Sequence, residues 1–318
     1  MILIIILVLA ASCLLNAQPV PTAEENLPYL VTFGSAADKS WGDDDFCQIF
    51  FYVIPASSKT PFYVRIYDPD TGGEIDEIKE TADTKTKFSI YGGTGSYTDK
   101  DARKVNPEGN YKSGNLMASK IFAADSKYDK NWYSFGPFNP SEGEYVKKFD
   151  GYVFKIIAEG VAGNDGNLYK YYFSTKTDDN APMEGGNTFT YEYTFRLSDN
   201  AGHISHIYPF VDDKVVTMNI HIFDWDSEGK VRIVSNARKG QACKLSGDSN
   251  WAETIFDILE DEKNSTFDVQ FVKPSGDPMK NNNAVIYITN QYNETLPFYT
   301  SPIGGAPQYQ YKIGVINH

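Results

Sequence analysis

The sequence predicts an all-β protein made of two tandem antiparallel β-sandwich domains. Aromatic residues make up 14% of the 318 residues, with 22 Tyr and 20 Phe, and these side chains favour strands. Short apolar or alternating runs recur between Gly- and Asn-rich turns, with almost no helical periodicity. A hydrophobic share of 41% is enough to build a sizeable core, so wholesale disorder is excluded.

The strand-like runs fall into two groups along the chain. We expect strands at 46–54, 62–67, 87–91, 152–158, 168–174 and 188–197 in the first group, and at 215–223, 231–234, 266–272 and 284–289 in the second. Residues 188–195 alternate polar and aromatic side chains strictly, which predicts one buried and one wet face. The turn-forming run at 163–167 predicts a hairpin, and 251–260 is the one helix candidate.

A polar, turn-rich stretch at 198–209 separates the two groups. We place the domain boundary near 200–208, which gives a first domain over 28–200 and a second over 207–318. Residues 65–73 (RIYDPDTGG) align with 221–229 (HIFDWDSEG), so the same acidic turn follows the same kind of strand twice. This echo indicates two related units.

The N-terminus indicates export. Residues 1–15 form an uncharged apolar run that is short for a membrane span and fits a secretory signal peptide. We expect a signal peptide over 1–17 and a periplasmic, cell-surface or extracellular chain. Lipid anchoring at Cys13 and an uncleaved anchor are the alternatives. No later segment is apolar enough to span a membrane, and the sequence leaves open whether Cys47 and Cys243 pair.

Composition and missing motifs exclude several function classes. The chain has 42 acidic and 29 basic residues, a formal net charge of −13, so nucleic acid is a poor partner. The sequence lacks a P-loop, a G-x-S-x-G elbow and a H-E-x-x-H zinc motif. We therefore predict a protein that is not an enzyme, and the enzymatic alternative is an exported hydrolase with an unrecognised carboxylate site.

The acidic turn at 68–77 (DPDTGGEIDE) is the sharpest chemical feature. Alternate Asp residues around Gly-Gly can supply the oxygen ligands that Ca²⁺ prefers. The predicted cation ligands are Asp68, Asp70, Glu74 and Asp76, with Asp224 and Asp226 as a leaner second copy. The alternative is an Asp-rich turn whose side chains cap their own backbone. Three further Asp residues at 43–45 either lend ligands to a nearby loop or form a solvated edge.

Aromatic residues offer a second route to function. Trp132 and Tyr133 lie in the aromatic run YDKNWYSFGPF, and Trp41 lies in a polar segment. Exposed on a sandwich, these rings could stack on sugars, which predicts a ligand-binding set of Trp41, Trp132 and Tyr133. The alternative is that they fill the core, as most aromatic residues do.

With a signal peptide, tandem β units and the D-x-D turns DPDTGG and FDWDSEG, the chain resembles exported proteins of the Gram-negative envelope. The turns themselves resemble those of thrombospondin type 3 repeats. The resemblance implies a larger, jelly-roll-like first domain and a smaller, immunoglobulin-like second domain. It also implies binding or adhesion, with a glycan or a cell-surface protein as partner. Carbohydrate-binding modules are the alternative.

Overall fold

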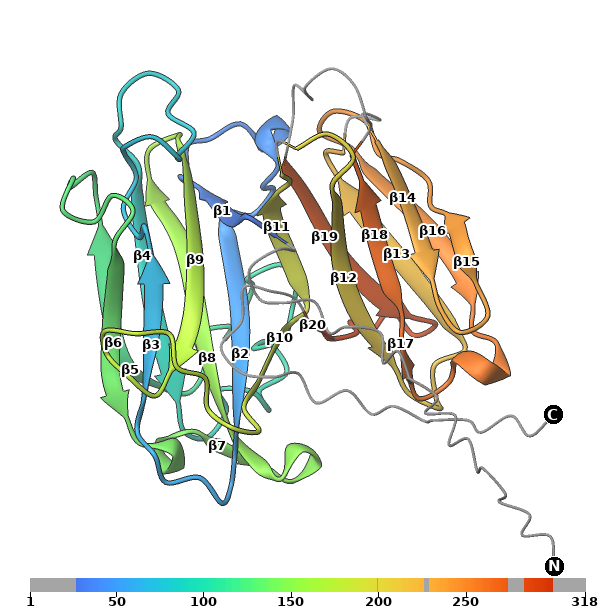
Figure 1. Cartoon of the computed structure of the whole chain (residues 1–318), viewed down its shortest axis with the longest axis horizontal. Helices are drawn as coiled ribbons and strands as arrows, with labels where there is room; N and C mark the ends of the chain where they lie inside the picture. Colours follow the sequence, from blue (N-terminus) through green and yellow to red (C-terminus); the bar gives the residue numbers. More distant parts are fainter. Residues whose placement is uncertain (1–26, 199, 226–228, 274–282, 300–318) are drawn as a thin grey trace, which may run out of the picture.

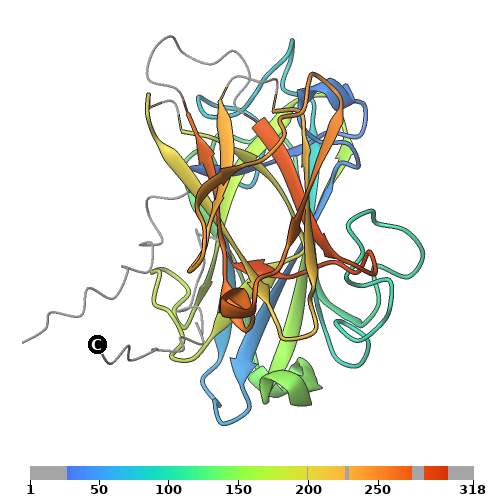
Figure 2. The same cartoon turned by 90° about the vertical axis from the view of Figure 1, so that its right-hand side faces the viewer.

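The computed structural model describes residues 27–198, 200–225, 229–273 and 283–299. Strands dominate this part of the chain and pair antiparallel, which confirms the predicted all-β class. They form two sheets that face each other as a sandwich, seen end-on in Figure 2. The predicted signal peptide and Cys13 lie outside the described residues.

One sheet has eight strands. In spatial order they are β16 (Trp251–Asp257), β13 (Thr217–Phe223), β19 (Asn283–Asn290), β11 (Glu192–Arg196), β1 (Tyr29–Phe33), β9 (Gly166–Ser174), β3 (Phe62–Tyr67) and β6 (Trp132–Phe138).

The other sheet has twelve strands. Its main path is β15 (Lys239–Ala242), β14 (Lys230–Val234), β18 (Asp268–Val272), β12 (Ile204–Val211), β20 (Phe298–Tyr299), β10 (Asn187–Thr190), β2 (Cys47–Pro55), β8 (Gly151–Ala162), β4 (Lys85–Gly92) and β5 (Asn115–Phe122). Off this path, β7 (Glu144–Val146) pairs with β8 and β17 (Ser265–Thr266) pairs with β12. The short 3₁₀ helices are η1 (Lys39–Trp41), η2 (Pro140–Glu142), η3 (Lys147–Phe149) and η4 (Glu260–Glu262).

The two halves of the chain repeat one strand order. The order β1-β9-β3-β6 recurs as β11-β19-β13-β16, and β10-β2-β8-β4-β5 recurs as β20-β12-β18-β14-β15. Each half is therefore a jelly roll, two facing sheets of antiparallel strands. The second half is a jelly roll like the first, and the immunoglobulin-like order expected there is not found.

Both sheets run on from one half to the other (Figure 1). In one sheet β1 pairs with β11, and in the other β10 pairs with β20. Because both pairs join equivalent strands antiparallel, the halves are related by an approximate two-fold rotation. The repeat begins again at Glu192, the first residue of β11, rather than at 207.

The strand β2 shows how the sequence produces this sandwich. Phe50, Tyr52 and Ile54 point between the sheets into the main core, whereas Phe51 and Val53 point outward and pack with other aromatic residues. Successive side chains of a strand face opposite ways, so a strand covered on both faces needs a continuous apolar run.

Three local expectations are wrong. Residues 163–167 do not close a hairpin, because β8 and β9 lie in different sheets. The Asp165 carboxylate accepts hydrogen bonds from the backbone N–H groups of Lys79, Asp83 and Thr84 at 2.9 to 3.2 Å. These bonds hold the connection from β8 to β9 in place as it passes from one sheet to the other. The helix expected at 251–260 is the edge strand β16, and the break expected at 198–209 contains most of β12.

Cys47 and Cys243 are both buried and are not joined by a disulfide. Among the described residues there is no helix long and apolar enough to cross a membrane.

Candidate functional site

The acidic turn after β3 lies against the segment that leads into β6, because these strands pair at the edge of the eight-stranded sheet. Asp68 directly follows β3 and has φ 53°. Its N–H donates to the carbonyl oxygen of Asn131 over 2.9 Å, and its Oδ2 accepts the N–H of Lys130 over 3.1 Å. Asp70 is held in the same way, since its Oδ2 accepts the N–H of Asp125 over 2.8 Å.

The second carboxylate oxygen of each Asp is buried without a donor. Asp68 is 1% exposed and Asp70 is fully buried, and within the described chain Oδ1 of each has no hydrogen-bond partner. Asp129, just before β6, completes the cluster: one carboxylate oxygen from each of the three lies within 4.8 Å of the others. Buried anionic oxygens without partners are costly, so the arrangement fits a bound cation.

Neutral oxygens lie beside this cluster. Asn167 Nδ2 donates to the carbonyl of Pro69 over 2.8 Å, which fixes the side chain against the turn. Asn167 Oδ1 and Thr71 Oγ1 are both buried and lack partners among the residues described. Gly73 has φ 68°, and a Cβ there would lie 2.9 Å from Cγ of Asp129, so glycine permits the close approach.

The electrostatics of the cluster favour a positive occupant. Burial, together with the neighbouring carboxylates of Asp70 and Asp129, raises the pKa of Asp68 to about 7. Burial likewise raises the pKa of Asp70. Like charges gathered in a low-dielectric site disfavour ionisation, and a divalent cation would offset both effects.

The other two predicted ligands of this turn are placed differently. The Glu74 side chain is 83% exposed and forms an ion pair with Lys130, outside the cluster. Both oxygens of Asp76 are already occupied: Oδ1 accepts the N–H of Leu168 and Oδ2 accepts that of Gly72, each over 2.7 Å. Asp76 therefore fixes the shape of the turn.

Asp224 repeats the backbone arrangement of Asp68 in the second half. It follows β13, has φ 58°, and donates its N–H to the carbonyl of Asn250 over 3.4 Å. Its carboxylate accepts the N–H of Ser249 over 3.1 Å. Asp226 lies outside the described residues, and within those described no acidic cluster includes Asp224.

A second repeated motif, missed in the sequence, accompanies the acidic turns. Residues 129–132 (DKNW) lead into β6, and residues 248–251 (DSNW) lead into β16 in the same way. The second residue of each has a left-handed backbone, with φ 55° at Lys130 and 54° at Ser249. Together with the similarity between residues 65–73 and 221–229, this motif could have predicted from the sequence that Asp129 lies beside Asp68.

The three aromatic residues predicted to bind a ligand do not form one surface. Lys79 covers Trp41, with Nζ 3.9 Å from the ring centroid. Trp132 lies beneath the guanidinium of Arg65, whose central carbon is 4.8 Å from the ring. Tyr133, the next residue in β6, packs against the main hydrophobic core.

A row of polar side chains, also missed, crosses four strands on the outer face of the eight-stranded sheet. The residues paired directly across β11, β19, β13 and β16 are Glu192, Tyr287, His221 and Glu253. Their chain neighbours in β11, β13 and β19 point the other way, into the core. No local pattern could reveal this row, because it depends on the register of strands far apart in sequence.

Aromatic rings gather along this row. The rings of His221 and Tyr287 stack at 4.3 Å, and Trp251, 39% exposed, lies 5.0 Å from Tyr287. The side chain of Trp251 lies close enough to the Asp44 carboxylate to act on its pKa and lower it, although burial raises that pKa overall. Burial lowers the pKa of His221 and raises that of Tyr287 to about 12, so both rings are neutral at pH 7.

No protein-family model matches this chain, and no curated protein matches its sequence.

Proposed function

We propose that the chain is an exported, non-enzymatic binding or adhesion protein of the cell envelope whose loops are stabilised by Ca²⁺. The cation ligands in this proposal are Asp68, Asp70 and Asp129. The observation that carries it is the pair of buried carboxylate oxygens, Oδ1 of Asp68 and Oδ1 of Asp70, that no described group donates to. A hard divalent cation takes six to eight oxygens, and Asn167 and Thr71 offer further ones.

The test is thermal unfolding of the chain with Ca²⁺ and with a chelator. A ligand that binds only the folded state raises its stability by mass action, so we expect a higher melting temperature in Ca²⁺. Asp70→Asn should reduce this increase. Glu74→Gln is the matched control, because it changes an exposed acid of the same turn and should keep the increase. An identical melting temperature in calcium and chelator contradicts the proposal.

A second candidate function is carbohydrate binding on the outer face of the eight-stranded sheet. The observation that favours it is Trp251, partly exposed beside Tyr287 and two residues from the acid Glu253. Flat apolar rings flanked by polar groups suit the faces and hydroxyls of sugars. A glycan array should detect binding that Trp251→Ala removes and Trp132→Ala retains. A silent array, or binding unchanged by Trp251→Ala, contradicts this candidate.

A further inference from the structure

A second group of acidic side chains lies where the two jelly rolls meet. Three consecutive Asp residues, 43–45, precede β2, and the chain turns at Phe46 with φ 58°. One carboxylate oxygen from each of the three Asp residues lies within 4.8 Å of the others. Asp43 is 1% exposed, so this run is not the solvated edge that its composition allows.

Backbone hydrogen bonds hold the carboxylates of Asp43 and Asp45 and leave one oxygen of each without a donor. Asp43 Oδ1 accepts the N–H of Phe46 over 2.7 Å and that of Asp45 over 3.2 Å. Asp45 Oδ1 accepts the N–H of Cys47 over 2.9 Å. Oδ2 of Asp43 and Oδ2 of Asp45 are buried and, among the described residues, have no donor. Asp68 and Asp70 show the same arrangement, in which one carboxylate oxygen accepts a backbone N–H and the other has no donor.

Glu192 is an independent observation that points to a ligand here. It is the first residue of β11, so it belongs to the second half, and only 9% of it is exposed. Its carboxylate interacts electrostatically with all three Asp residues, and no hydrogen bond to it is found within the described chain. A largely buried carboxylate that is repelled by three nearby carboxylates is unfavourable without a cation.

The charges around the group do not balance it. Burial raises the pKa values of Asp44 and Asp45, and the positive charge of Lys39 lowers them only slightly. However, no lysine or arginine in the described part of the chain forms an ion pair with any of the four acids. Burial raises the pKa of Asp43 to about 7 and raises the pKa values of Asp45 and Glu192. Burial is the main cause of these shifts and repulsion between the carboxylates adds to it, and a divalent cation would offset both.

We propose that Asp43, Asp44, Asp45 and Glu192 form a second site for a hard divalent cation such as Ca²⁺, and that this cation ties the two jelly rolls together. The direct backbone contact there is sparse, since β1 and β11 pair only at Tyr29 with Arg196 and at Leu30 with Phe195. A cation between the loop before β2 and the start of β11 would reinforce this junction. The site does not depend on calcium at Asp68 and Asp70.

The first test locates the ions. Crystals of the chain soaked in Tb³⁺, which replaces Ca²⁺ on oxygen ligands, should give an anomalous peak bounded by the carboxylates of Asp43, Asp44, Asp45 and Glu192. A map without a peak there overturns this inference. A peak there without one at Asp68 and Asp70 supports it and contradicts the proposed function, so the two failures are distinguishable.

The second test uses Glu192→Gln, which keeps the shape of the side chain and breaks no described hydrogen bond. Calcium titration by calorimetry should show two sites in the unaltered chain, one of them at least tenfold weaker in the variant. With chelator the variant should melt at the same or a higher temperature, because repulsion is relieved. Glu253→Gln, on the same outer row, should bind as the unaltered chain does. If Glu192→Gln keeps both sites at full affinity, the inference is overturned.

Discussion

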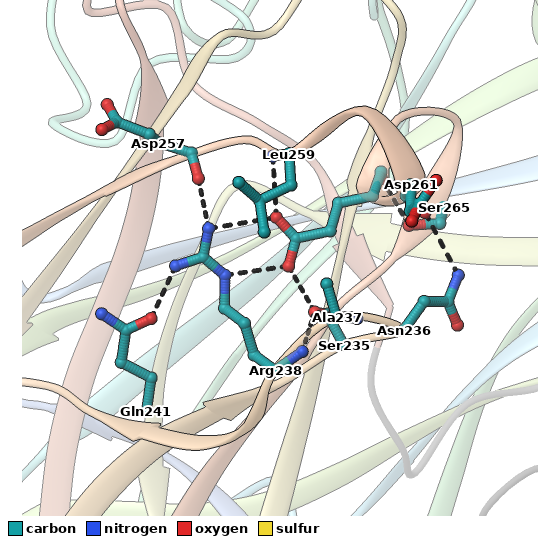
Figure 3. Close-up of polar contacts among 10 residues, drawn as sticks. Ser235, Asn236, Ala237, Arg238, Gln241, Asp257, Leu259, Asp261 and Ser265 are labelled. Carbon is teal, nitrogen blue, oxygen red and sulfur yellow. Dashed lines mark hydrogen bonds and ion pairs between the residues drawn. The ribbon is translucent and has the colours of Figure 1, made fainter.

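Arg238 and Glu262 form a bidentate ion pair inside the second jelly roll (Figure 3). Arg238 Nε lies 2.8 Å from Glu262 Oε1, and Nη2 lies 3.1 Å from Oε2. Glu262 is fully buried, and its oxygens also accept the N–H of Leu259 over 2.9 Å and the hydroxyl of Ser235. This pair fixes the β14–β15 turn against η4.

Glu262→Gln should therefore destabilise the fold strongly. Removing one partner of a buried, hydrogen-bonded pair leaves the other charge uncompensated, which costs about 3–5 kcal/mol. Urea unfolding followed by circular dichroism measures the loss. Glu260→Gln is the control, because Glu260 pairs with Lys263 at the surface and should cost less than about 1 kcal/mol. Equal effects of the two variants would contradict the assigned role of the pair.

The same pair predicts a pH dependence. Burial acts to raise the pKa of Glu262, but hydrogen bonds from Arg238, Ser235 and the Leu259 N–H outweigh it, and the pKa lies below its usual value. A lowered folded-state pKa contributes stability that is present above the unfolded-state pKa and lost as the pH falls through the folded one. The difference in unfolding free energy between the unaltered chain and Glu262→Gln should be largest near pH 7 and shrink toward pH 3. A difference independent of pH would contradict the assignment.

Lys155 predicts a second pH dependence, on the alkaline side. It is fully buried under the β4–β5 connection, where its ammonium donates to the carbonyl of Tyr111 and to Ser113 Oγ. Burial lowers its pKa to about 8, so the charge penalises the fold below that pH and the penalty fades between about pH 8 and 10.5. Lys155→Met removes the charge, so its stability relative to the unaltered chain should fall as the pH rises from 7 to 10. Unfolding curves at both pH values test this, and a constant difference would contradict it.

The sequence predicted strands where side chains alone determine the outcome. The apolar run of β2 and the alternation of β10 and β11 reflect local burial, and both are strands. At 251–260 the spacing of Ile255, Phe256 and Leu259 also suits a helix. This segment forms a strand because β16 pairs with β13 along its whole length, and β13 is distant in sequence. Strand β12 was missed because its polar outer residues, such as His206, resemble a linker.

Some residues of the candidate sites could likewise be predicted from local sequence, whereas others depend on contacts between distant strands. Asp68 and Asp70 share one turn, so local composition points to both. Asp129 and Glu192 reach their clusters only through the pairing of β3 with β6 and the meeting of the two halves. Glu74 and Asp76 were predicted as ligands from spacing alone, yet the turn directs Glu74 to solvent and uses Asp76 for backbone bonds.

Gln48 should be essential for the junction between the halves. Its Nε2 donates to the carbonyl of Val31 in β1 over 2.7 Å, and its Oε1 accepts the N–H of Thr194 in β11 over 3.0 Å. Gln48→Met would leave both buried backbone groups unpaired, at about 1–3 kcal/mol each. Gln291 bridges the Val216 N–H and the Lys214 carbonyl in the same manner near solvent, so Gln291→Met should cost little. Urea unfolding of both variants tests this, and a similar cost for the two would contradict it.

The two copies of the acidic turn should respond differently to the same substitution. Asp129 contributes a carboxylate to the cluster with Asp68 and Asp70, whereas Asp248, its counterpart in the second half, is exposed. Calcium at one hundred times its dissociation constant adds about 2.7 kcal/mol to folding stability, and a tenfold weaker site loses about 1.4 kcal/mol of that gain. We expect Asp129→Asn to lose at least this much of the calcium-dependent gain, and Asp248→Asn to keep it. Unfolding in calcium and in chelator gives the gain for each variant. If the two variants lose equal amounts, calcium does not distinguish the copies, and Asp129 is not a ligand.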